Sequence, residues 1–148
     1  MQASDFKSLF IRDLDRLMDE LETYTSEESL WIKVDGINNS AGNLFMHLCG
    51  NLQHFIGAVL ANSGYERKRD FEFNGRVTID ELKTDIQETK RVLEDYFQNE
   101  SNTAYDKEYP LQPFGYTMTI NYFLMHLLGH LNYHLGQINY HRRILSKT

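Results

Sequence analysis

Histidines are the residues whose spacing in this chain points most clearly to chemistry. Four of the six lie between Met125 and His141, and three of these, His126, His130 and His134, recur every four residues. On an α-helix each lies about 40° round the axis from the one before, and the leucines between them indicate that they face or border the interior. A buried imidazole without a polar partner costs about 1–3 kcal/mol. Several on one apolar helix therefore suggest a shared partner, for which a metal ion is the simplest candidate.

Helical geometry limits how these histidines could share one ion. Neighbours four residues apart can both reach a metal, as in helical zinc motifs, whereas residues eight apart are separated by about 12 Å along the axis. The last helix therefore supplies two ligands, and a third comes from a second helix that carries His47 and His54. Spacing alone leaves open the pair, His126/His130 or His130/His134, and its partner, His47 or His54. The plain alternative is that these histidines are interior or surface residues that bind nothing.

Three polar residues lie near these histidines. Two are amides with two interpretations each, and the third is a cysteine for which we expect no role at the metal. Asn51 lies one turn from His47, and Gln137 lies three residues after His134. Either amide could orient a ligand or a bound molecule, and either could equally serve helix packing. Cys49 lies roughly 200° round the helix from His47 and should point away from the same metal. No definite general base is visible, so the catalytic residues stay unknown.

A basic and acidic run, 67–73, contains two arginines that can be interpreted in two ways. Arg67 and Arg69 could bind a carboxylate at the mouth of the site through their forked guanidinium groups. They could instead pair with Asp70 or Glu72 and hold the loop in place. We favour the second, structural interpretation.

Four segments carry apolar residues at steps of three and four, which is typical of amphipathic helices. Their expected ranges are 4–25, 39 or 40 to about 62, 78 to about 98, and 117 to about 145. Ser4 and Thr117 are plausible N-caps, Thr78 to Glu81 reads as a capping box, and Gly64 is a stop signal. These segments predict an all-α protein built as a four-helix bundle. Connections of about 14 to 18 residues would permit a crossover topology.

The connections and glycines carry further expectations. Residues 30–34 could form a short extended piece that ends at the turn dipeptide Asp35-Gly36. Residues 65–77 could form a polar loop, and Tyr105–Phe114 one short strand or irregular extended pieces. Trp31 should plug one end of the core. Glycines at 42, 50 and 57 weaken the second helix by up to about 1 kcal/mol each, which indicates that something approaches its backbone closely.

Composition limits the class of protein. The 148 residues suffice for one domain, 1–148, with a full core. A net charge of −6 argues against general nucleic-acid binding. Cys49 is the single cysteine and fits a reducing compartment. Neither an uninterrupted run of 18 apolar residues nor a signal-peptide pattern is visible, so we expect a cytoplasmic protein that does not enter a membrane.

Three stretches of the chain resemble motifs of one family. His130–Ile138 (HLNYHLGQI) resembles the HxxxHxGQI signature of the DinB/YfiT-like metalloprotein superfamily. Asn43–Leu52 (NLFMHLCGNL) is similar to the NLxxHLxGNL segment of its DinB-like branch, and the run 67–73 (RKRDFEF) resembles that branch's RxRxxEF link. Their order and spacing agree with the family, and they cover the chain apart from its first and third helices.

The resemblance implies a fold and a set of ligands. It implies a bundle of four helices with an unusual crossed connection, commonly assembled as a homodimer, and a divalent metal held by His47, His130 and His134. His54 and His126 fall outside the motifs and are interpreted as supporting or core residues. His141, beside two arginines, should lie near the surface.

Three neutral imidazoles leave coordination positions open, as in catalytic rather than structural zinc sites. Nitrogen ligands suit zinc and nickel alike. Some relatives are thiol transferases or isomerases, so the resemblance implies a metal that activates a low-molecular-weight thiol, such as bacillithiol or mycothiol, for attack on a small electrophile. A hydrolase that activates water is a variant of this hypothesis. The alternative from another class is a metal-binding or interaction protein of the stress response that has no turnover.

Overall fold

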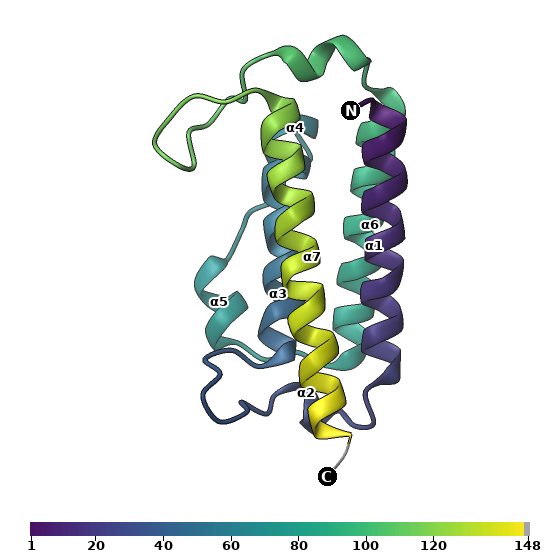
Figure 1. The fold of residues 1–148 in the computed structure, drawn as a ribbon, viewed down its shortest axis with the longest axis vertical. Coiled ribbons are helices and arrows are strands. Elements are labelled where there is room, and N and C mark those ends of the chain that lie inside the picture. The colour runs from purple at the N-terminus through teal and green to yellow at the C-terminus, as the bar shows by residue number, and fades with distance from the viewer. Residues whose placement is uncertain (147–148) are drawn as a thin grey trace.

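The computed structural model describes residues 1–146, and its regular structure is helical (Figure 1). The long helical segments are α1 (Ala3–Thr23), α3 (Ala41–Leu52), α6 (Ile79–Asn99) and α7 (Ile120–Leu145). α3 continues through a π-helical turn, η1 (Gln53–Ala58), into α4 (Val59–Ala61). Shorter helices in the connections are α2 (Glu27–Leu30), α5 (Arg69–Asn74) and the 3-10 turn η2 (Asn102–Asp106). The prediction of an all-α protein is confirmed.

In the bundle, helices that follow one another in sequence are not the closest neighbours in space. α1 packs against α6 and α7, and α3 packs against the same two helices, so α1 and α3 occupy one diagonal. α1 and α7 run in one direction and α3 and α6 in the other (Figure 1). The connection from α4 to α6 therefore returns along the bundle, which is a crossover. This arrangement makes α3 and α7 antiparallel neighbours.

Side-chain caps mark where α3 and α6 begin. Ser40 Oγ accepts the backbone N–H of Asn43 at the start of α3, and Thr78 and Glu81 form the predicted capping box of α6. The second predicted helix ends where expected, because Asn62 adopts a left-handed conformation with φ 51°. These boundaries could be predicted because each depends on residues within one turn.

The other two predicted caps are wrong. α1 begins after Gln2 rather than Ser4, because the N–H of Gln2 already donates to a carboxylate in the first turn. α7 begins after Thr119 rather than Thr117, because an antiparallel bridge between Glu108 and Thr119 keeps the preceding residues extended. In both cases a hydrogen-bonding interaction fixes the backbone in a way that excludes the predicted cap. In the second case this interaction joins two different segments of the chain.

Three of the expected connections also differ. Residues 27–30 form a helix, which Ser26 caps by accepting the N–H of Ser29, so Leu30 ends a helix and does not begin the expected extended piece. The expected polar loop 65–77 contains α5, which packs against α3. Among the described residues no strand forms. The Tyr105–Phe114 segment contains the end of η2 and Glu108, one partner of the isolated bridge, so of its two predicted alternatives the short strand is wrong. The predicted close approach to Gly42 is real, since the Trp31 ring lies where a Cβ would be.

The π-helical turn after α3 was not predicted. Such a turn displaces backbone carbonyls from the regular i→i−4 pattern. Here the Phe55 carbonyl accepts a hydrogen bond from the Tyr109 hydroxyl at 2.8 Å, and the Gly57 carbonyl accepts one from the Ser63 N–H. The irregular turn is therefore stabilised by groups outside α3.

α3 is the most buried helix, since every residue from Ala41 to Gln53 is buried. Although it contains polar residues, the segment Ala41–Ala61 is long and apolar enough to cross a membrane by composition. The bundle covers 67% of its most apolar window, which is typical of a helix in a protein core. Polar residues on this helix are therefore placed inside the bundle, where each needs a partner.

Candidate metal centre

Three histidines converge where α3 and α7 face each other. His47 lies in the middle of α3, and His130 and His134 lie one turn apart on α7. One ring nitrogen from each falls within 4.8 Å of the other two, and His47 Nε2 lies 3.1 Å from His130 Nε2. The antiparallel packing thus brings together His47 and His130, which are 83 positions apart in the sequence.

The orientation of His47 is set by a carboxylate on α5. Its Nδ1–H donates to Glu72 Oε1 at 3.1 Å, and a carboxylate can only accept. Arg67 Nη2 also lies 3.4 Å from this nitrogen, but it donates over a shorter distance, 2.8 Å, to Glu72. The proton of His47 is therefore on Nδ1, and the lone pair on Nε2 faces the other two histidines. This is the usual way in which an outer carboxylate orients a metal-binding imidazole.

Glu72 is held firmly in turn. Arg67 binds both carboxylate oxygens, with Nε 2.9 Å from Oε2 and Nη2 2.8 Å from Oε1. The side-chain amide of Asn43 donates to the Glu72 backbone carbonyl at 3.1 Å. Gly50 makes the approach possible, because a Cβ at this position would collide with the carboxylate. The predicted close approach to this glycine is confirmed, and its cause is Glu72.

The Glu72 carboxyl is ionised at neutral pH. Burial alone would raise its pKa, but the hydrogen bonds from Arg67 and His47 outweigh burial and lower the pKa below its usual value. Arg67 is paired with Glu72 through both carboxylate oxygens, which agrees with the structural interpretation of this arginine. Arg69 pairs with neither predicted acid among the described contacts and lies over the Phe73 ring instead, 5.3 Å from its centroid.

The two histidines of α7 are supported unequally. His134 Nδ1–H donates to Gln137 Oε1 at 2.7 Å, which leaves the lone pair of Nε2 on the side of the other histidines. His130 Nδ1 is buried and has no hydrogen-bond partner in the part of the chain that the structure describes. Burial, followed by the neighbouring His134 and His47, lowers the pKa of His130 to about 3. Burial also lowers the pKa of His134, so both imidazoles are neutral at pH 7.

This arrangement fits a divalent cation. Two nitrogens bound to one tetrahedral zinc ion at about 2.0–2.1 Å lie roughly 3.3 Å apart, close to the 3.1 Å between the Nε2 atoms of His47 and His130. A cation would receive lone pairs that otherwise face one another. It would also fix His130 with its proton on Nδ1. Three nitrogen ligands leave at least one coordination position open.

The remaining candidate histidines lie outside the cluster. His126 is exposed, contrary to the prediction that it faces the interior, and its ring packs against Phe114 at 4.6 Å. His54 is half-buried beside Phe55, and burial and the charge of Arg67 lower its pKa. Neither belongs to the three-histidine group among the described residues.

Two further residues on α3 behave differently from each other. Cys49 is buried outside the cluster, as predicted, and burial raises the pKa of its thiol. Asn51 is also buried, and its side-chain oxygen has no hydrogen-bond partner among residues 1–146. Gln137, the other predicted amide, does orient a histidine.

The expectation that His141 lies near the surface is wrong. It is buried, with Nδ1 2.9 Å from the Tyr24 hydroxyl and Nε2 2.7 Å from the Ile32 carbonyl oxygen. The partners come from the residues that follow α1 and α2, two helices that pack against α7. Nothing in the local sequence around His141 reports these contacts.

Sequence reasoning missed two residues at the site, Glu72 and Phe73. Glu72 was weighed only as a partner for an arginine, and the Phe73 ring, which packs 4.8 Å from the ring of His47, was not considered. Two signals were available. Gly50, a glycine inside a helix that carries a predicted ligand, indicated that something must come close, and the last two positions of the RxRxxEF link are Glu72 and Phe73. Neither signal indicated that an acid contacts His47.

Comparison with known proteins places the chain in a family. No curated protein matches the chain. The model of the DinB superfamily matches residues 9–138, which include all three clustered histidines, Glu72 and Gln137. Since the match extends over most of the chain, the protein belongs to the DinB superfamily.

Proposed function

We propose that this protein is a divalent-metal-dependent enzyme that transfers a low-molecular-weight thiol to a small electrophile. The observation that carries the proposal is the convergence of three imidazole nitrogens, which no fourth ligand from residues 1–146 joins. Such sites keep a position for water or substrate. The proposed ligands are His47, His130 and His134, and zinc or nickel suits them equally.

The chain's own residues hold the site ready to bind. Glu72 and Gln137 keep the protons of His47 and His134 on Nδ1, so Nε2 is available in each without a change of tautomer. The lowered pKa of His130 keeps that ring neutral near pH 7. A bound divalent cation would lower the pKa of a thiol or water in its open position.

The surroundings favour a thiol over water as the nucleophile. Hydrolysis benefits from a general base, but the carboxylate that contacts the cluster, Glu72, lies on the Nδ1 side of His47 and is bound by Arg67. A thiol ionises near pH 8.5, far more readily than water, and its proton can pass to solvent. The sulfur then forms a bond to the electrophilic carbon, and the leaving group departs with the electrons of the broken bond.

A transfer assay tests this function. We would mix metal-loaded protein with a panel of low-molecular-weight thiols and 1-chloro-2,4-dinitrobenzene, and follow the thioether by absorbance. We expect conjugation that stops on chelation, returns on addition of zinc or nickel, and is missing in His47→Ala. Conjugation at the uncatalysed rate with every thiol and a range of electrophiles would overturn the transferase proposal.

Two alternatives predict other outcomes for the same protein. A hydrolase would cleave activated esters or amides in a metal-dependent manner without any added thiol. A non-catalytic metal-binding protein would retain the ion and show no turnover in either assay. Among the residues that the structure describes, the cluster has no free carboxylate that could act as a general base, and this favours the non-catalytic alternative.

We further propose that two copies associate in the cytoplasm, as members of the family commonly do. The outward face of α7 supports this, because Tyr122, Met125 and Tyr133 are exposed there. Gly129 lies between them, and a Cβ at this position would meet nothing in the chain, so internal packing does not require the glycine. Light scattering should give the mass of a dimer, reduced by Tyr133→Asp and unchanged by Leu111→Asp, a change at an exposed residue of the 107–118 connection. A monomeric mass for the unaltered protein would overturn the dimer.

A further inference from the structure

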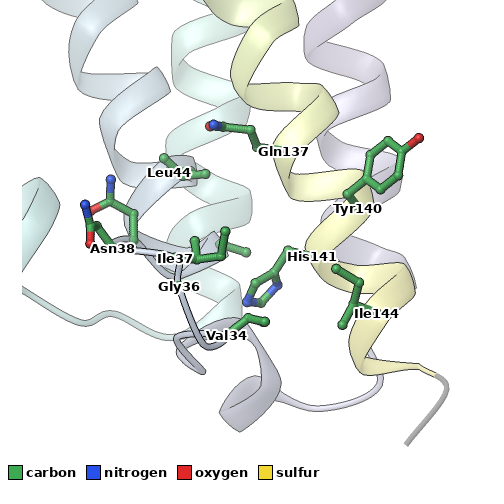
Figure 2. A pocket seen from close by; sticks show the side chains of 11 residues that line it. Val34, Gly36, Ile37, Asn38, Leu44, Gln137, Tyr140, His141 and Ile144 are labelled. Carbon is green, nitrogen blue, oxygen red and sulfur yellow. The ribbon is translucent and has the colours of Figure 1, made fainter.

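A cavity of about 340 Å³ lies beside the last turns of α7, next to the candidate metal centre. It is bounded by the loop 34–39 on one side and by Tyr140, His141 and Ile144 on the other (Figure 2). This volume falls within the range of small-molecule sites. Neither the three histidines nor Glu72 line the cavity, so it is separate from the metal centre.

The walls of this cavity are mostly apolar and partly rigid. Ile37, Leu44 and Ile144 supply aliphatic surface, and Tyr140 supplies an aromatic ring. His141 also lines it, but the Tyr24 hydroxyl and the Ile32 carbonyl use both of its ring nitrogens. The histidine therefore adds a fixed surface rather than a further donor. A ligand of this cavity must gain most of its affinity from apolar contact.

Gln137 connects the cavity to the metal centre. Its Oε1 accepts the proton of His134 Nδ1, and the residue also lines the cavity. In Figure 2 its amide extends from α7 into the space between α7 and α3, on the side of Leu44. Its NH₂ group donates to no partner in the part of the chain that the structure describes. Two donors are therefore available at the edge of the apolar cavity, on the Nδ1 side of His134.

We infer that this cavity binds the apolar part of the electrophilic substrate, and that the Gln137 NH₂ group binds a carbonyl or similar acceptor between that part and the reacting carbon. The inference rests on the proposed thiol transfer, because only that reaction makes the ligand of this cavity a substrate. It defines the substrate class as a small molecule with an aliphatic or aromatic group of a few carbons next to a hydrogen-bond acceptor.

Binding of neutral primary amides tests the cavity without requiring turnover. Acetamide, butanamide and hexanamide share a carbonyl and differ in chain length, and none carries a charge that would favour the metal. Protein-observed NMR titrations should show shifts at residues 34–38 and at the Gln137 side-chain amide. We expect affinity to rise about fourfold for each added CH₂ group, in metal-loaded and metal-free protein alike.

Two exposed isoleucines provide matched variants. Ile37 lines the cavity and Ile32 does not, and both side chains lie about half exposed on the same connection, so neither change should unfold the protein. Ile37→Asp should weaken hexanamide binding at least fivefold, while Ile32→Asp should leave it unchanged. Gln137→Leu should reduce the affinity for all three amides by a similar factor, because it removes the donors and keeps the apolar wall.

The outcomes separate this inference from the proposed function. If binding depends on chain length but the protein has no transferase activity, the cavity is a binding site for apolar groups and the proposed reaction is wrong. Equal affinity for the three amides, or equal effects of the two aspartate variants, would overturn the inference even in an active enzyme. A dimer that dissociates on Ile37→Asp and binds no amide would assign this surface to a second copy, which also overturns it.

Discussion

Two buried histidines, His47 and His141, have almost the same exposure, 8% and 7%, and opposite chemistry. The Nε2 of His141 faces a carbonyl, which can only accept, so this nitrogen carries the proton and Nδ1 accepts from the Tyr24 hydroxyl. Both nitrogens are then used within the protein. His47 gives one nitrogen to Glu72 and keeps the lone pair of the other facing His130 and His134.

Burial therefore does not identify a metal ligand. A buried imidazole needs partners in either region, and the difference lies in whether the protein supplies one partner or two. At the end of α7, His141 has two neutral partners from other segments, Tyr24 and Ile32, and the result is a structural contact. Between the middles of α3 and α7, the protein supplies one anionic partner, Glu72 of α5, and three lone pairs converge, which favours a cation.

Removal of a proposed ligand should have the largest effect on this difference. We expect untagged protein to hold one divalent ion per chain, and His47→Ala to lose it, because two imidazoles that remain bind far more weakly than three. His141→Ala should unfold at a lower temperature but retain the ion. Elemental analysis after gel filtration measures both. Full metal content in His47→Ala would show that the two histidines do not differ in the proposed way.

Acidification should have the next largest effect, and mainly at the cluster. In metal-free protein the pKa of His130 is about 3 in the folded state and about 6.5 when unfolded. The unfolded state thus binds more protons between these values, and stability falls as pH decreases from about 6.5 to 3. Protons also compete with metal for the imidazoles.

The increase in melting temperature caused by zinc or nickel should therefore shrink steadily from pH 7 to pH 4. Calorimetry with and without the metal at each pH measures this increase. His47→Ala is the control, since it should show little increase at any pH. An increase that stays constant down to pH 4 would mean that the metal binds at groups other than imidazoles.

Most of the bundle could be predicted because its determinants are local. The capping box of Thr78 and Glu81, the cap Ser40 and the left-handed Asn62 all lie within one turn of the boundary they define. The bridge that moves the start of α7 to Thr119 joins two segments, and the π-helical turn depends on groups outside its helix. No local pattern carries that information.

The predictions for the site also differ according to whether the determinants are local or distant in the sequence. The spacing of the histidines indicated a pair on one helix but left two pairs and two partners open, and the choice of His47, His130 and His134 rested on the family resemblance. Glu72 was missed because α5, which positions it, was expected to be a loop. His141 was misplaced because its partners, the Tyr24 hydroxyl and the Ile32 carbonyl, lie more than a hundred residues away, as separations of 117 and 109 show.

Removal of the charge on the partner of His47 should have an intermediate effect. Glu72→Gln keeps the size of the side chain but weakens the hold on Nδ1–H, and we expect metal affinity to fall about 10- to 100-fold. Glu20→Gln is a matched control, because Glu20 is also partly buried and paired with an arginine, Arg142, away from the cluster. Competition with a chromogenic chelator measures both. Equal losses in the two variants would remove the special role of Glu72.

The smallest effect on metal affinity should come from Tyr24→Phe, which removes a hydrogen-bond partner of His141. The change removes the hydroxyl 2.9 Å from His141 Nδ1 and leaves a buried lone pair without a donor. We expect the free energy of unfolding to fall by about 1–3 kcal/mol, measured by urea titration, with metal affinity unchanged within twofold. Since Gln137 lies one turn from His141 and holds His134, a marked loss of metal affinity would show that the two histidine regions are coupled through α7. An unchanged stability would instead show that His141 finds another partner, such as water, when the hydroxyl is removed.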